Sequence, residues 1–151
     1  MKKNIIVTGG LGFIGSNLIE LLIKQKYSII NLDKISYSSN FYNVRDFKKH
    51  KNYQFIKCNL NESKKLLKIF KKYKPICVFN LAAETHVDRS IDMPKDFIDN
   101  NIVAVFNLLL AFRKFAEMIK QTRLIHVSTD EVFGDILKGR SSEKYQYRPS
   151  S

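Results

Sequence analysis

A glycine-rich segment near the start of the chain has the composition and spacing of a turn that binds phosphate groups. Four of the six glycines of this 151-residue chain lie in Thr8-Gly-Gly-Leu-Gly-Phe-Ile-Gly15, between an apolar run and a helical pattern. Gly10, Gly12 and Gly15 satisfy G-x-G-x-x-G, and Gly9 adds a G-x-x-G-x-x-G register. Glycine lets the backbone approach a pyrophosphate, and the following helix offers unpaired N–H groups and the positive end of its dipole. The segment therefore predicts a dinucleotide site.

Asp33 supplies a carboxylate where such a site needs one. It ends the second predicted strand, 18 residues after Gly15. A carboxylate there accepts hydrogen bonds from the adenine ribose hydroxyls and repels a 2′-phosphate, so the sequence favours NAD over NADP. The adjacent Lys34 is a cation that tolerates some phosphate at the same place. The competing interpretation is that the glycine turn and Asp33 serve packing alone.

A hydroxyl and two carboxyl groups stand together at Thr129, Asp130 and Glu131, where the fifth predicted strand ends. Two neighbouring carboxyl groups whose environments give them different pKa values commonly act as the general acid and the general base of one reaction. The competing interpretation is a solvated pair in a loop. Two histidines have their own alternatives. His126 lies in an apolar strand and is expected to be a core residue, whereas His86 either touches a substrate or orders its loop.

Short β-branched runs alternate with longer helical patterns, and these elements must position the residues above. The predicted strands are Asn4–Thr8, Ser28–Asp33, Tyr53–Cys58, Ile76–Leu81 and Arg123–Ser128, and the predicted helices are Phe13–Lys26, Glu62–Tyr73 and a long one at 93–120 capped by Asp92. Strands that are apolar on both faces predict an α/β fold, a doubly wound, Rossmann-like parallel sheet. We expect residues 1–134 to form an incomplete dinucleotide-binding domain, truncated before its last strands, because the pattern fades after Gly134. Residues 135–151 are expected to form a polar loop or tail.

Charge and composition bear on which classes of partner the protein can have. The net charge is +12, and residues 45–74 contain eleven Lys or Arg against two acidic residues. The lysines of this stretch fall on the solvated face of the helix at 62–73, and lysine outnumbers arginine twenty to six, so we expect no nucleic-acid partner. No apolar run is long enough to span a membrane, and no leader precedes the first strand, which predicts a cytoplasmic protein. Cys58 and Cys77 are expected to be reduced thiols, and no His, Cys and carboxylate set has metal spacing.

Three segments in order resemble the extended short-chain dehydrogenase/reductases: the glycine turn, Asn80-Leu-Ala-Ala-Glu-Thr-His-Val-Asp-Arg-Ser90, and Ser128-Thr-Asp-Glu-Val-Phe-Gly134. More narrowly, the chain resembles the dTDP-glucose 4,6-dehydratases over essentially all its residues. The resemblance implies NAD, a nucleotide-sugar substrate and a lyase reaction of deoxysugar and rhamnose biosynthesis, which moves a hydride within the sugar and expels water. The product is a 4-keto-6-deoxy sugar nucleotide.

The resemblance also implies roles for individual residues. Glu131 matches the base that removes the C5 proton, and Asp130 matches the acid that protonates the departing C6 hydroxyl. Thr129 and Thr85 match positions that hydrogen-bond the sugar. The positions expected to contact the cofactor are Gly9, Gly12, Phe13, Ile14, Gly15, Asp33, Lys34, Ile35, Ser36, Asn59, Leu60, Leu81, Ala82, Ala83, Glu84, Thr85 and Asn100.

The chain departs from the family pattern at three points. Asn59 stands where the family has an Asp that holds the adenine amino group, and Asn100 replaces a Thr near the cofactor. The family's Tyr-x-x-x-Lys pair, which oxidises C4, is expected beyond Ser151, because Tyr145 and Tyr147 have no lysine four residues on. The C-terminal substrate domain that the resemblance implies is expected beyond Ser151 as well. We therefore expect these 151 residues to be inactive alone.

Alternatives remain for the function and the assembly. One is another extended family member such as a nucleotide-sugar epimerase, against which the paired carboxyls at 130–131 argue, since epimerisation expels no hydroxyl. Another is an NAD-binding module without catalysis. The wide apolar arc of the helix at 93–120 predicts a homodimer of the full-length protein. The sequence does not choose between dTDP- and UDP-linked sugars.

Overall fold

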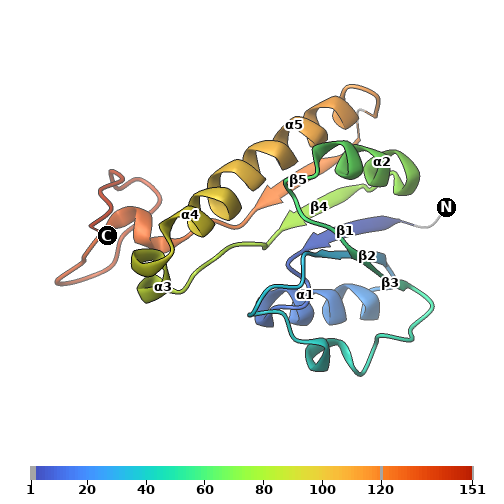
Figure 1. Cartoon of the computed structure of the whole chain (residues 1–151), viewed down its shortest axis with the longest axis horizontal. Coiled ribbons are helices and arrows are strands. Elements are labelled where there is room, and N and C mark those ends of the chain that lie inside the picture. The colour runs from blue at the N-terminus through green and yellow to red at the C-terminus, as the bar shows by residue number, and fades with distance from the viewer. Residues whose placement is uncertain (1–2, 120, 151) are drawn as a thin grey trace.

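The structure is a computed structural model that describes residues 3–119 and 121–150. Its centre is a sheet of five parallel strands in the order β3-β2-β1-β4-β5 (Figure 1). The strands are β1 (Asn4–Thr8), β2 (Ser28–Asp33), β3 (Tyr53–Lys57), β4 (Cys77–Asn80) and β5 (Arg123–His126). The strand order reverses between β1 and β4. The predicted doubly wound parallel sheet is therefore confirmed.

Helices cover both faces of the sheet, with α1 (Phe13–Lys24) on one side and α2 (Ser63–Tyr73) and α5 (Ala104–Ala116) on the other (Figure 1). Alternation along β1 sends side chains into both layers, because successive residues of a strand face opposite ways. Ile5 and Val7 pack with α1, whereas Ile6 packs with α2 and α5. Both cores are needed because a parallel sheet is buried on its two faces.

The lysine-rich helix α2 illustrates how the pattern folds. Its buried side chains are Leu66, Ile69 and Phe70, which recur at helical spacing and contact the core beneath. The lysines lie on the outer face, as the sequence predicts. The helix ends at Tyr73, and its C-cap residue Lys74 adopts a left-handed conformation with φ 45°.

The predicted long helix at 93–120 is wrong in detail. Two short helices, α3 (Val87–Asp92) and α4 (Pro94–Phe97), are followed by a π-helical segment, η2 (Ile98–Val103), before α5 begins. Asp92 ends α3 instead of capping a helix, and the N-cap of α4 is Met93, with no side-chain capping bond. The end predicted at 120 lies outside the described residues.

Smaller differences concern the ends of elements and the loops. The strands β3, β4 and β5 each stop one or two residues before their predicted ends. Two 3-10 turns, η1 (Phe41–Val44) and η3 (Asp130–Phe133), were not predicted. No helix or strand is found at 135–150. Within the described ranges, no helix is both long and apolar enough to cross a membrane.

Candidate functional site

The glycine turn between β1 and α1 packs too tightly for side chains. Gly9 has φ +68°, and a Cβ there would lie 2.9 Å from the backbone N and Cα of Ala82, at the end of β4. A Cβ at Gly15 would lie 2.4 Å from the Gly9 carbonyl oxygen. The Gly12 N–H donates to that same oxygen at 3.1 Å, which closes the turn. Glycine is therefore required where β1, β4 and α1 converge.

The first helical turn of α1, which follows the glycine turn, has backbone N–H groups without partners in the helix. The helix starts at Phe13 after Gly12 as N-cap, so the N–H groups of Phe13, Ile14 and Gly15 are not used within the helix. The side chains of Phe13 and Ile14 are 80% and 63% exposed. These two residues therefore offer backbone N–H groups, with the dipole behind them, while their side chains lie in solvent.

Asp33 is 6% exposed and its carboxylate is held by three donors. Its Oδ2 accepts the Leu11 N–H at 3.1 Å, and its Oδ1 accepts the Ile35 N–H at 2.8 Å and the Ser39 hydroxyl at 2.7 Å. A carboxylate has about four lone-pair positions, so an acceptor position remains for a further hydroxyl. This geometry fits a ribose.

A groove opens at the carboxyl ends of β1, β2 and β4, and most of the predicted cofactor residues line it. The predicted residues that line it are Gly9, Gly12, Asp33, Lys34, Ser36, Asn59, Leu60, Leu81, Ala82, Ala83, Glu84 and Asn100. Four further lining residues were missed by sequence reasoning: Leu32, Ser38, Ser39 and Ala104. The predicted residues outside the lining are Phe13, Ile14, Gly15, Ile35 and Thr85.

Two asparagines of the groove stand at positions that depart from the family pattern. The Asn59 side-chain oxygen accepts the Asn61 N–H at 3.0 Å, and its second lone pair remains available. The Asn100 side chain, in the π-helical segment, donates to the Asp96 carbonyl of α4 at 2.7 Å. π-Helical segments are frequent at functional sites, and this one brings Asn100 to the groove.

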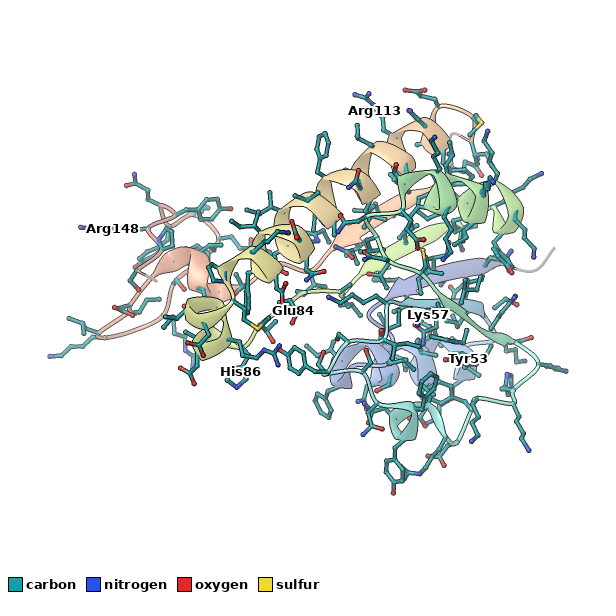
Figure 2. The ribbon with its side chains drawn as sticks, viewed as in Figure 1. Tyr53, Lys57, Glu84, His86, Arg113 and Arg148 are labelled. Carbon is teal, nitrogen blue, oxygen red and sulfur yellow. The ribbon has the colours of Figure 1, made fainter. Side chains whose placement is uncertain are left out.

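An ion pair joins the two walls of the groove, and a cation–π contact outside the groove lining links the loop after β2 to α3. Lys34 Nζ, after β2, lies 2.9 Å from Glu84 Oε1, after β4. The Arg89 guanidinium stacks 3.7 Å from the centre of the Tyr37 ring. Partial burial raises the pKa of Tyr37, and the Glu84 charge raises it further. Figure 2 shows Glu84 between the sheet and α3.

A second hollow adjoins the groove and shares the wall formed by Ala82, Ala83 and Glu84. It brings together Thr85, Thr129 and Glu131 from segments that are far apart in sequence, and Asn101 and His126 also line it. Thr129 caps the 3-10 turn η3 by accepting the Glu131 N–H at 3.2 Å. Three of the residues predicted to act on a substrate therefore meet at one place.

Other predicted residues lie outside this hollow. Asp130 is exposed and is not among the lining residues, and its Oδ1 accepts the Thr129 hydroxyl at 3.5 Å. His86 is the exposed N-cap of α3 and lines neither cavity (Figure 2). His126 is exposed at the end of the edge strand β5, so the prediction of a core histidine is wrong. Its Nδ1 is nevertheless paired with Asn80 Nδ2 at 2.8 Å.

The pair Tyr53 and Lys57 has Tyr-x-x-x-Lys spacing, but it lies on a strand. Both residues belong to β3 (Figure 2), where four residues span about 13 Å. Burial raises the pKa of Tyr53, although its hydrogen bond with Asn31 lowers it in part. The pair therefore lacks helical geometry, and the raised pKa of Tyr53 is the opposite of what a catalytic tyrosine needs.

The fold and its two hollows define a class: a doubly wound α/β protein whose cavities open at the carboxyl ends of the strands, where the strand order reverses. Residues 6–151 match the family model described as GDP-mannose 4,6 dehydratase. The chain belongs to this family.

Relatives and solved structures agree with this assignment. The chain is 41% identical to a dTDP-glucose 4,6-dehydratase of Neisseria gonorrhoeae, over 99% of the chain and 46% of the relative. It superposes on the NAD complex of a dTDP-glucose 4,6-dehydratase from Bacillus anthracis with a TM-score of 0.84 and 34% identity, over 99% of this chain and 45% of that one. A UDP-glucose 4-epimerase from Thermotoga maritima, solved with UDP-glucose, gives a TM-score of 0.82 and 30% identity over 97% and 45%. The chain thus spans about half the length of the curated relatives it matches.

Proposed function

We propose that the groove binds NAD, with the pyrophosphate at the first turn of α1 and the adenine ribose at Asp33. The open N–H groups of Phe13, Ile14 and Gly15 and the remaining acceptor position of Asp33 support this proposal. The NAD complex of the Bacillus anthracis relative supports it as well. The Asp33→Asn variant is expected to bind NAD about tenfold more weakly, because a charge-assisted hydrogen bond becomes a neutral one.

We further propose that the full-length protein is a nucleotide-sugar 4,6-dehydratase of the dTDP-glucose type. The observation that carries this proposal is the hollow in which Glu131, Thr129 and Thr85 meet across a thin wall from the groove. The wall contains two alanines, Ala82 and Ala83, whose small side chains would let a sugar on one side approach a nicotinamide on the other. Reactants held in this way gain much of their rate from proximity.

The proposed chemistry divides between cofactor and protein. When bound, NAD would take a hydride from C4 of the sugar and return it to C6. The C4 ketone acidifies the proton on C5, and Glu131 removes that proton as a general base. Asp130 protonates the C6 hydroxyl, which leaves as water while a C5–C6 double bond forms. The proton then returns to C5 as hydride reaches C6, so the net change is loss of one water.

Thr85 and Thr129 would hold the sugar during these steps by hydrogen bonds to its hydroxyls. Asp130 does not line the hollow. Its proposed role as the acid therefore requires its side chain to move toward the C6 hydroxyl when the sugar binds. The C4 hydroxyl needs a further base, a role that Tyr53 and Lys57 on β3 are not placed to serve.

The test is product formation by the full-length protein loaded with NAD. We expect a 4-keto-6-deoxy sugar from dTDP-glucose, with UDP-glucose assayed in parallel. Glu131→Gln is expected to lower kcat by about 10²- to 10⁴-fold without weakening NAD binding, because general-base catalysis contributes that much. The control is Glu143→Gln, an exposed carboxyl that lines neither cavity. A C4 epimer as product would establish the epimerase alternative, and no reaction by folded, NAD-loaded protein would establish the non-catalytic one.

We also propose that the full-length protein is a cytoplasmic homodimer that pairs along η2 and α5. Ile98, Ile102, Phe106 and Leu109 recur at helical spacing on the outer side of this helix and are 47–63% exposed. A contiguous apolar stripe of this kind is typical of a protein interface. Sedimentation of Phe106→Glu is expected to give a monomer where the unmodified protein gives a dimer. The two free thiols, Cys58 and Cys77, support the proposed reducing compartment.

A further inference from the structure

The ion pair between Lys34 and Glu84 crosses the groove beside Asp33. The two charged atoms lie 2.9 Å apart, and the side chains are 33% and 8% exposed. Lys34 follows Asp33 directly, so its ammonium is the group that would meet a phosphate on the adenine ribose. That ammonium is already paired with the nearly buried carboxylate of Glu84.

Glu84 is the fixed member of the pair. The Asn101 side-chain oxygen accepts the Glu84 N–H at 2.8 Å, and the Asn101 amide donates to the Glu84 carbonyl at 2.8 Å. These two bonds hold the Glu84 backbone against the π-helical segment. Lys34 has a longer and more exposed side chain with more rotatable bonds, so it is the member that would turn toward another anion.

The groove walls carry more negative than positive charge. Among the described lining residues, Asp33, Lys34 and Glu84 carry formal charges, so Lys34 is the cation of this wall. NADP brings a 2′-phosphate with about −1.5 to −2 charges to the neighbourhood of Asp33. Resting on the proposed NAD site, we propose that Glu84 is a specificity-determining residue, which holds the Lys34 ammonium and so denies a cation to the 2′-phosphate of NADP.

Discrimination is then shared by two carboxylates. Asp33 accepts a ribose hydroxyl and repels the phosphate directly, while Glu84 removes the compensating charge. From the sequence, Lys34 beside Asp33 suggests some tolerance for NADP. In the proposed arrangement, Glu84 holds this lysine, and the pair then contributes to the discrimination against NADP.

The experiment is calorimetric titration of the whole chain with NAD and with NADP at one ionic strength. Glu84→Gln is expected to raise the affinity for NADP about tenfold relative to the affinity for NAD, because a charge-assisted contact from Lys34 becomes available. The Glu84→Gln/Lys34→Gln double variant is expected to lose that gain. The control is Glu20→Gln, which breaks an exposed ion pair of 2.7 Å with Lys24 on α1, outside the groove lining.

The outcomes separate the two proposals. If the unmodified chain binds no NAD, the proposed cofactor site is wrong and the inference falls with it. If it binds NAD but Glu84→Gln gains no NADP affinity, or the gain survives in the double variant, the inference alone is wrong. Gln has the size of Glu and keeps the two backbone hydrogen bonds with Asn101, but it carries no charge to hold the Lys34 ammonium. Thermal melting verifies that the variant folds. Glu84→Asp provides a second arm: it keeps the charge, withdraws it by one methylene, and is expected to give a smaller NADP gain.

Discussion

Replacing Gly15 by alanine would test whether the glycine turn is built as described. The new Cβ would lie 2.4 Å from the Gly9 carbonyl oxygen and 2.8 Å from Gly10 Cα, both backbone atoms that cannot rotate away. Relief requires α1 to shift from the turn by roughly 1 Å, since ordinary contact begins at 3.4 Å. Overpacking of this kind costs about 3 kcal/mol, and alanine in a helix regains about 1 kcal/mol. We expect a net loss of about 2 kcal/mol in the free energy of unfolding.

Urea denaturation followed by circular dichroism measures this loss, and NAD titration measures its effect on the groove. The N–H groups of the first turn move with the helix, so we expect NAD affinity to fall at least about tenfold. Gly12→Ala is the matched control, because its Cβ would meet one atom, the Gly9 oxygen, at 3.2 Å, and it should cost less than about 1 kcal/mol. Equal stability of Gly15→Ala and the unmodified chain, or an equal cost at Gly12, would refute the reasoning.

Three further predictions follow from single residues. Burial raises the pKa of the Cys58 thiol to about 11, so the stability that the thiol contributes is complete below pH 9 and is lost as the pH rises toward 11. Cys58→Ala should therefore make the free energy of unfolding, measured by urea denaturation, less dependent on pH in that window. An unchanged pH dependence would contradict this. Thr8→Val should cost about 3 kcal/mol, measured by urea denaturation, because the buried hydroxyl donates to Asn80 and accepts two backbone N–H groups, whereas Thr8→Ser should cost less than about 1 kcal/mol. Lys74→Gly should stabilise by about 0.5 to 1 kcal/mol, because glycine adopts the left-handed cap without strain, and a lower melting temperature would count against it.

The parts of the fold that depend on local pattern were predictable, and those that depend on tertiary contact were not. The strands follow from runs of β-branched residues, so their positions were correct within one or two residues. The helix at 93–120 was predicted as one piece because its apolar period continues through η2, where the hydrogen-bond pattern changes without a change in composition. The six residues of α3 are too few to show a period.

The site divides in the same way. The glycine turn and Asp33 were identified because their spacing is itself the signal. Ser38 and Ser39 were missed because the loop after β2 turns back at Ile35, with φ 63°, and nothing in the residue types announces that turn. The Lys34–Glu84 pair joins residues 50 positions apart, which no local pattern records.

The segment of Ala82, Ala83 and Glu84 lines both cavities, so the proposed dinucleotide and sugar would contact the same wall from its two sides. A dinucleotide that orders this segment leaves less conformational entropy for a sugar to remove, and the sugar then binds more tightly. Thermodynamic linkage requires the converse by the same factor, so a bound sugar slows the escape of the dinucleotide beneath it or tightens its capture. If the proposed internal hydride transfer takes place here, such cooperativity would keep the cofactor and the sugar together until the hydride returns.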